Sequence, residues 1–187
     1  GEYINSRSNI EIETEYGKCI SSVKTLMKNS LPTILSAIDK DSYFRNKLKR
    51  LNKYYRDGSF NIISEYVDTS TPLITLDKYG RCSLDPSSLL AGTKPNIETS
   101  LDKTSYFKNI LLDVNQSYRE GEFILSGEYV DCSPPIKITT NTFERYITPN
   151  SLRTFKNKHR PHTSINEEYL LKTLELKNSN YRNGNFS

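Results

Sequence analysis

The pattern of apolar and polar residues in the middle of the chain predicts three short strands in succession. The segments 60–67 (FNIISEYV) and 123–130 (FILSGEYV) are rich in β-branched and aromatic residues, which are typical of strands. Short polar residues and a proline at 68–72 predict a turn after the first of them. Further short strands are expected at 73–76 and 82–84.

Two helices are predicted after these strands. Pro86 can open a single helical turn (PSSLLAG) that Gly92 can end. Asp102 can cap a longer helix, which we expect to run from Lys103 to Tyr118. The apolar residues of this helix recur at spacings of three and four, as one buried face requires: Phe107, Ile110, Leu111 and Val114.

The same pattern occurs three times at an interval of 63 residues. Aligning residues 1–63 with 64–126 without a gap gives 20 identities in 63 positions. Unrelated sequences would match at roughly one position in fifteen to twenty. The third unit, 127–187, is divergent and ends two residues short of three full repeats. We therefore expect an α+β fold of three tandem units of about 63 residues, each a three-stranded antiparallel sheet followed by a short and a longer helix.

Comparison of the units separates positions that maintain the fold from positions that could recognise a partner. Residues identical in all three units most simply maintain the fold, and in the first unit they are Glu2, Tyr3, Leu26, Asn52, Tyr55, Arg56, Gly58 and Phe60. Polar positions that differ, such as the equivalent Lys18, Arg81 and Glu144, could read different bases in a modular reader.

The composition favours a folded protein outside membranes. The chain is 35% hydrophobic with 13 Tyr and 7 Phe, which is too aromatic for a disordered segment. A 63-residue unit is marginal alone, so neighbouring units should share surface. The sequence shows no apolar run of membrane-spanning length and no signal peptide at its start. We expect an excerpt of a longer protein, located in the cytoplasm (the host cytoplasm for a phage-encoded protein).

Enzyme motifs and cofactor motifs were not found. The three cysteines imply no disulfide framework, and Cys19 and Cys82 are interpreted as small buried hydrophobes in a reducing compartment. His159 and His162 could form a two-histidine metal pair, but a metal site normally needs four ligands at defined spacing. We therefore expect no catalytic residue, no metal and no cofactor in this chain.

The basic residues form two candidate surfaces for a polyanion. The net charge is +4, with 11 basic and 7 acidic residues in the first unit, 6 and 9 in the second, and 9 and 6 in the third. One candidate is a helix face of the first unit, formed by Arg45, Lys49, Lys53 and Arg56. The other units keep only the last of these positions, so this face is either a special contact of the first unit or an ordinary solvated surface.

The second basic region recurs in every unit, in the short helix and the loop that follows it. Its members are Lys24 and Lys28 in the first unit, Lys94 in the second, and Arg153, Lys156, Lys158 and Arg160 in the third. Cations presented at a fixed period suit double-stranded DNA, because phosphate contacts supply most non-specific affinity. Unremarkable surface lysines are the alternative interpretation.

Several short motifs carry a family resemblance that covers the whole chain. The stretches GEYI, EYGKC and SAIDKDSYF, with SEYV, KYGRC and SLLAGTKPNIETSLDKTSYF one repeat later, resemble the tandem repeats preceding the nuclease modules of phage-encoded, homing-type endonucleases, including very-short-patch-repair-like ones. The resemblance implies a DNA-targeting segment, with cleavage done by a separate domain. Related repeats often carry Cys and His-Gly pairs. Here only Cys19 and Cys82 remain and Thr142-Phe143 replaces the third Tyr-Gly, which argues against metal binding.

Two functions of different classes remain open from the sequence. The first is a non-catalytic DNA-binding array that targets a longer, phage-type protein, such as a nuclease, to DNA. The second is a protein-interaction or virion-assembly array without nucleic-acid binding. The recurring cations after the short helix favour the first, whereas the acidic middle unit favours protein partners.

Overall fold

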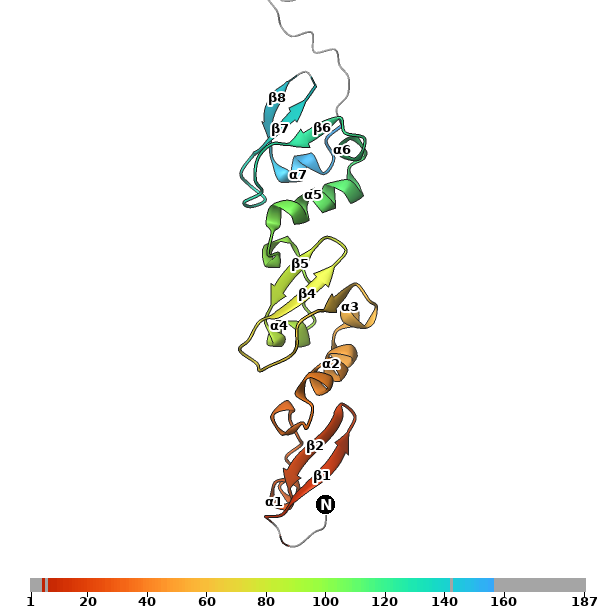
Figure 1. Ribbon diagram of the computed structural model, residues 1–187, viewed down its shortest axis with the longest axis vertical. Helices are drawn as coiled ribbons and strands as arrows, with labels where there is room; N and C mark the ends of the chain where they lie inside the picture. Colours follow the sequence, from red (N-terminus) through yellow and green to blue (C-terminus); the bar gives the residue numbers. More distant parts are fainter. Residues whose placement is uncertain (1–4, 6, 142, 157–187) are drawn as a thin grey trace, which may run out of the picture.

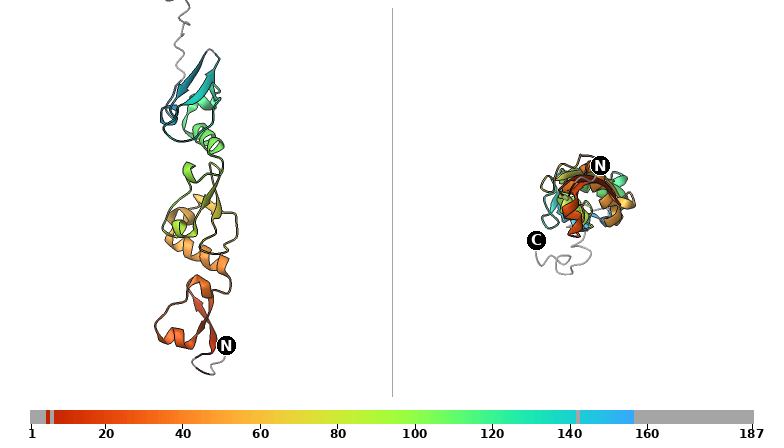
Figure 2. Two further views of the ribbon diagram at one scale, coloured as in Figure 1. Left: turned by 90° about the vertical axis from the view of Figure 1, so that its left-hand side faces the viewer. Right: turned by 90° about the horizontal axis from the view of Figure 1, so that it is seen from below.

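The chain forms an elongated array in which small sheets alternate with pairs of helices along one axis (Figure 1). The computed structural model describes residues 5, 7–141 and 143–156. Seen along its length, the array is narrow, with successive units stacked over one another (Figure 2). Within the described ranges, no helix is both long enough and apolar enough to cross a membrane.

The described strands form three small antiparallel sheets, which confirms the predicted α+β class. The first sheet pairs β1 (Asn9–Thr14) with β2 (Gly17–Ser22). The second has the order β3 (Phe60–Ile62), β4 (Leu73–Asp77), β5 (Arg81–Leu84), and the third the order β6 (Phe123–Leu125), β7 (Ile136–Thr140), β8 (Glu144–Ile147). Among the described residues, the first sheet thus has two strands, whereas three were expected.

The helices between the sheets also recur at intervals of 63 residues. The short helices that follow each sheet are α1 (Val23–Met27), α4 (Pro86–Leu90) and α7 (Pro149–Leu152). Single 3₁₀ turns follow the first two of them, η1 (Ile34–Ser36) and η2 (Ile97–Thr99). The long helices are α2 (Lys40–Leu51) and α5 (Lys103–Val114), and each is followed by one more helical turn, α3 (Lys53–Arg56) and α6 (Gln116–Arg119).

The predicted helix over 103–118 is wrong in its extent, because α5 ends at Val114 and α6 begins at Gln116, with Asn115 between them. The equivalent asparagine one repeat earlier, Asn52, shows the reason. Asn52 is fully buried between α2 and α3. Its side-chain oxygen accepts hydrogen bonds from the backbone of Tyr54 (3.0 Å) and Tyr55 (3.2 Å), so it caps α3. Its side-chain nitrogen donates to the carbonyls of Leu89 (2.8 Å) and Thr93 (2.9 Å), at the end of α4. All four hydrogen-bonding sites of the amide are therefore used.

Asn115 does the same between α5 and α6. Its oxygen accepts from the backbone of Tyr118 at 3.0 Å, and its nitrogen donates to the carbonyls of Leu152 (2.6 Å) and Phe155 (2.8 Å). The second carbonyl is one residue earlier than the position equivalent to Thr93, so the loop after α7 already departs from the loop after α4. This asparagine clamp joins each helix pair to the short helix of the sheet that follows it.

Each long helix packs against two sheets. Tyr43 lies in a small cluster with Cys19 of the preceding hairpin and with Ala37, whereas Phe44 and Leu48 lie in the core of the following sheet. In α5 the pattern repeats, with Tyr106 on the preceding core and Phe107 and Leu111 in the next one. Neighbouring units therefore share a helix, as a marginal repeat unit requires.

Polar contacts fix the junction between each hairpin and the next long helix. The amide of Asn109 donates to the carbonyl of Tyr79 at 2.8 Å, and the amide of Asn46 donates to the carbonyl of Tyr16 at 3.0 Å. The two junctions are thus built from the same residue types at equivalent positions.

The ion pair at these junctions is reversed in sign between units. Glu15 pairs with Arg50 at the first junction, and at the equivalent positions Lys78 pairs with Asp113 at 2.7 Å. The bonds from Lys78 and Tyr79 hold the pKa of Asp113 below its ordinary value. Opposite charges are kept although both residues differ, which indicates that the pairing itself matters.

We expect replacement of Asn52 by Ala to lower the free energy of unfolding by roughly 3 kcal/mol, since it removes a helix cap and leaves two carbonyls without their donor. Asn52→Asp keeps the cap but loses the donors, so it should also destabilise. Urea denaturation followed by tyrosine fluorescence measures both. The control Asn61→Ala, on the exposed side of β3, should change stability by less than about 0.5 kcal/mol. Equal effects of Asn52→Ala and the control would contradict the clamp.

We expect Lys78→Glu and Asp113→Arg each to lower the midpoint of thermal unfolding, and the double variant to restore it, because the pair then has the signs of the first junction. The differences should shrink at about 1 M salt, where charges are screened within about 3 Å. Since the pKa of Asp113 is depressed in the folded state, its contribution is present above about pH 4 and is lost as the pH falls below that value. A double variant less stable than both single variants would refute the pairing.

Candidate nucleic-acid interface

The recurring basic region lies on the short helices and on the loops after them, of which the asparagine clamp holds those after α4 and α7. All five of its described members have exposed side chains: Lys24, Lys28, Lys94, Arg153 and Lys156. None of them forms an ion pair with a carboxylate within the part of the chain that the structure describes. These cations are therefore available to an external anion. Lys158 and Arg160 lie outside the described residues.

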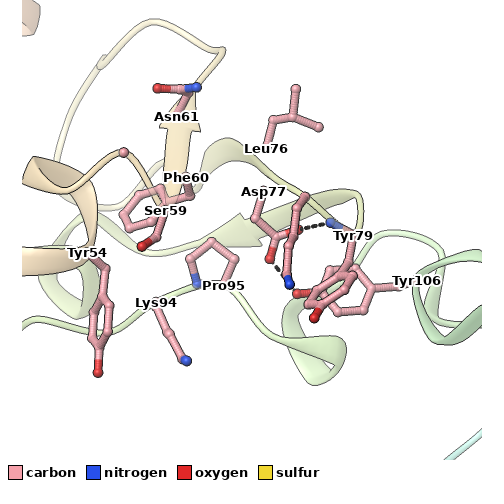
Figure 3. A pocket seen from close by; sticks show the side chains of 12 residues that line it. Tyr54, Ser59, Phe60, Asn61, Leu76, Asp77, Tyr79, Lys94, Pro95 and Tyr106 are labelled. Carbon is pink, nitrogen blue, oxygen red and sulfur yellow. Dashed lines mark hydrogen bonds between the residues drawn. The ribbon is translucent and has the colours of Figure 1, made fainter. Parts of the chain in front are cut away.

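In the second unit, Lys94 borders a groove of about 520 Å³ that runs between α3, the β4–β5 turn and the loop after α4 (Figure 3). Its ammonium group lies 5.2 Å from the centre of the Tyr54 ring, and that of Lys53 lies 4.8 Å from the same ring. Figure 3 shows Tyr54 and Lys94 on one side of Pro95, with Tyr79 and Tyr106 on the other. Lysine and tyrosine side chains are among those that contact phosphates and sugars in protein–DNA complexes.

The far side of this groove is organised by Asp77. Its carboxylate accepts hydrogen bonds from the backbone of Tyr79 (2.8 Å) and Gly80 (3.0 Å) and from the hydroxyl of Tyr106 (2.5 Å). Burial and the bond to Asp77 raise the pKa of Tyr106 far above its ordinary value. Lys78 lies 4.6 Å from the centre of the Tyr79 ring, but its ammonium group is paired with Asp113 at 2.7 Å. Among the described residues, the lysines beside the groove that form no ion pair are Lys53 and Lys94, on the Tyr54 side.

Gly80 gives the Tyr106 ring room in this arrangement. A β-carbon at this position would lie 3.3 Å from a ring carbon of Tyr106, at a φ of 155°, so a larger residue would force the ring to shift. The same glycine follows Tyr16 in the first unit as Gly17. The Tyr-Gly pair is thus a structural part of the hairpin turn.

The third unit has a second groove of about 570 Å³ at a related place, between α6 and the loop after α7. Arg153 and Lys156 line it, opposite Glu120 and Glu122. The position of Tyr54 is taken by Ser117, which is buried. This groove therefore has cations and carboxylates on opposite sides and lacks the tyrosine of the second unit.

The other predicted surface, the basic helix face, does not form one surface in the structure. Arg45 is partly buried, and its guanidinium pairs with Asp41 (2.6 Å) and donates to the carbonyls of Ile62 (3.1 Å) and Ser64 (2.8 Å). It ties the long helix to β3 and its following loop. Lys49 is on α2, whereas Lys53 and Arg56 are on α3 beyond the helix break, and all three side chains are exposed. The four residues therefore do not form one continuous stripe.

No sequence pattern indicates that Tyr54, Lys78 and Tyr79 line one groove with Lys94. Tyr54 is not repeated, because the second unit has Ser117 at that position. The signal that was available was the repeated Tyr-Gly pair, which marks the hairpin turn in both units. The groove arises only when segments around 54, 78 and 94 meet in space.

The described residues give no support for a metal site. Over the described residues, no cluster of three or more His, Cys, Asp or Glu side chains could hold a metal ion. Cys19 and Cys82 are buried, and Cys132 is exposed. His159 and His162 lie outside the described residues.

No protein-family model, curated protein or solved structure matched the chain.

We expect Tyr106→Phe to reduce the loss of stability at alkaline pH. Because the pKa of Tyr106 is raised in the folded state, its contribution is complete below about pH 10 and is lost as the pH rises above that value, where the unfolded chain ionises first. Urea midpoints between pH 8 and pH 11 test this expectation. Tyr146→Phe, an exposed position, is the control. An alkaline loss identical in both variants would contradict the role of the Tyr106–Asp77 bond.

Proposed function

We propose that this chain is a non-catalytic, tandem-repeat DNA-binding region that targets a longer, phage-type protein to double-stranded DNA. The observation that supports it most directly is that each clamped loop carries exposed cations. In the second and third units the buried asparagine fixes the loop that bears Lys94 or Lys156. A surface fixed before binding loses less conformational entropy when it meets its ligand.

The repeat gives this surface a function that one unit would lack. Along the described part of the array, each of the three sheets is followed by a short helix and by at least one exposed cation in that helix or just after it. Linked weak sites bind more tightly than separate ones when they engage the same ligand together. Differing polar residues at equivalent positions, such as Arg81 and Glu144, supply the means to distinguish sequences. The motif resemblance to endonuclease-associated repeats is consistent with this assignment, and cleavage would belong to a separate domain.

The groove beside Lys94 favours nucleic acid over a simple anion. Lys53 and Lys94 lie beside the Tyr54 ring, and the carboxylate that lines the groove, Asp77, accepts hydrogen bonds from three donors. Phosphates of the duplex would contact these lysines, and its sugar–phosphate backbone would contact the tyrosine.

A protein-interaction or virion-assembly array is the second candidate, and the acidic middle unit favours it. Residues 64–126 carry 6 basic and 9 acidic residues, so their net repulsion opposes DNA except at local cationic surfaces. If replacement of the described cations left DNA affinity unchanged, this second candidate would be favoured.

We expect Arg153→Ala together with Lys156→Ala to weaken binding to a duplex. The slope of log affinity against log salt should flatten by about 0.9 for each phosphate that the variant no longer neutralises. Lys94→Ala should weaken binding less, because it removes one cation. Fluorescence anisotropy at several salt concentrations measures both quantities.

The matched control is Lys49→Ala with Arg56→Ala, which removes the same charge from the competing helix face. We expect a smaller effect from this pair, since the structure does not make that face continuous. Equal reductions in affinity from both pairs would mean that net charge alone drives binding. Unchanged affinity and salt slope in every variant, with circular dichroism unchanged, would refute the DNA-binding proposal.

A further inference from the structure

The first hairpin and its short helix expose a face that is covered in the other two units. Leu89 and Leu152, the anchors of α4 and α7, are completely buried. Their equivalent Leu26 is only partly buried, and α1 contains no buried residue at all. The next residue, Met27, is 77% exposed, whereas its equivalent Leu90 packs against the core of the second unit.

The sheet shows the same difference. Leu73 of β4 and Ile136 of β7 are buried, but the equivalent Ile10 of β1 is only partly buried. β4 and β7 each lie between two partner strands, whereas β1 pairs only with β2 among the described strands. Within the part of the chain that the structure describes, one face and one edge of the hairpin are thus open together.

The covering element is the same in both complete units. It is a helix pair followed by a short strand, α2–α3–β3 for the second unit and α5–α6–β6 for the third. Phe44 and Leu48, or Phe107 and Leu111, supply the apolar contacts, and the asparagine between the helices reaches the end of the short helix.

The acceptors for that asparagine are already arranged in the first unit. After α4 the chain turns at Gly92 with a φ of 90°, and after α1 it turns at Asn29 with a φ of 57°. Both are in the left-handed region, so the two loops turn alike. The carbonyls of Leu26 and Ser30, equivalent to those of Leu89 and Thr93, receive no side-chain amide from the described part of the chain.

From this comparison we infer that the face formed by β1 and α1 is a docking site for one more helix pair and strand of the same repeat, supplied by another repeat unit. The covering segment would place an asparagine amide on the carbonyls of Leu26 and Ser30, apolar helix residues on Ile10 and Leu26, and a strand on the free edge of β1. A nucleic acid does not meet these requirements, because it offers neither an apolar helix face nor a β-strand. The inference does not depend on whether the array binds DNA.

The test supplies that segment and measures amide hydrogen exchange in the first hairpin. A copy of residues 39–63 is fused directly before residue 1 of the full chain, which reproduces the connection that residues 39–63 have with residue 64. We expect hydrogen exchange of the β1 and β2 amides to slow by about tenfold or more, because the opening of a covered sheet requires undocking of the helix pair. Exchange in β7 and β8 serves as the internal reference.

Two control fusions make the result specific. The first carries Asn52→Ala in the copied segment, and the second carries Leu48→Asp there. Both should return exchange in β1 and β2 to within about twofold of the unfused chain. The inference is overturned by unchanged exchange with the intact copy, or by equal slowing with all three copies, which would indicate a non-specific tether. Fluorescence anisotropy with duplex DNA on the same fusions reports DNA binding separately, so either idea can fail alone.

Discussion

A buried asparagine amide holds each complete unit together. Asn52 and Asn115 end one helix, cap the next and bind two carbonyls at the end of a short helix that lies 37 residues away in sequence. A buried amide is costly unless its donors and acceptors are satisfied, so it tolerates few alternative arrangements. This requirement fixes the angle between the helices, the position of the short helix and the path of the loop after it.

The long helices extend this order from one unit to the next. Adjacent residues on α2, Tyr43 and Phe44, belong to two different clusters, one on each side of the helix. Small units with limited cores gain stability by sharing an element in this way, and a shared helix also restricts how neighbouring units can rotate. The reversed ion pairs at the two junctions show that the contact is preserved by charge complementarity although the residues differ.

The surface proposed to bind DNA depends on the same amide. The clamp ties the loop bearing Lys94 to the helix pair through the carbonyl of Thr93. With it, Lys94 is placed beside Tyr54, opposite the Tyr79 and Lys78 side of the groove. Lys94 is thus positioned by the core, whereas the short helix of the first hairpin, α1, contains no buried residue.

The sequence by itself determined the α+β class, the 63-residue interval, the strands near 73–76 and 82–84, the helix at Pro86 and the cap at Asp102, because these depend on residue preferences and periodicities within a few positions. The strands expected at 60–67 and 123–130 are shorter in the structure and cover only Phe60–Ile62 and Phe123–Leu125. It also marked Asn52 as a residue that maintains the fold. Only the tertiary structure decided that this asparagine interrupts the helix, that Arg45 binds β3 and its following loop instead of solvent, and that Tyr54 and Lys78 border the groove of Lys94. The physical reason is distance along the chain. The partners of Asn52 lie 37 and 41 residues away, and no local pattern specifies which distant carbonyl a buried amide will bind.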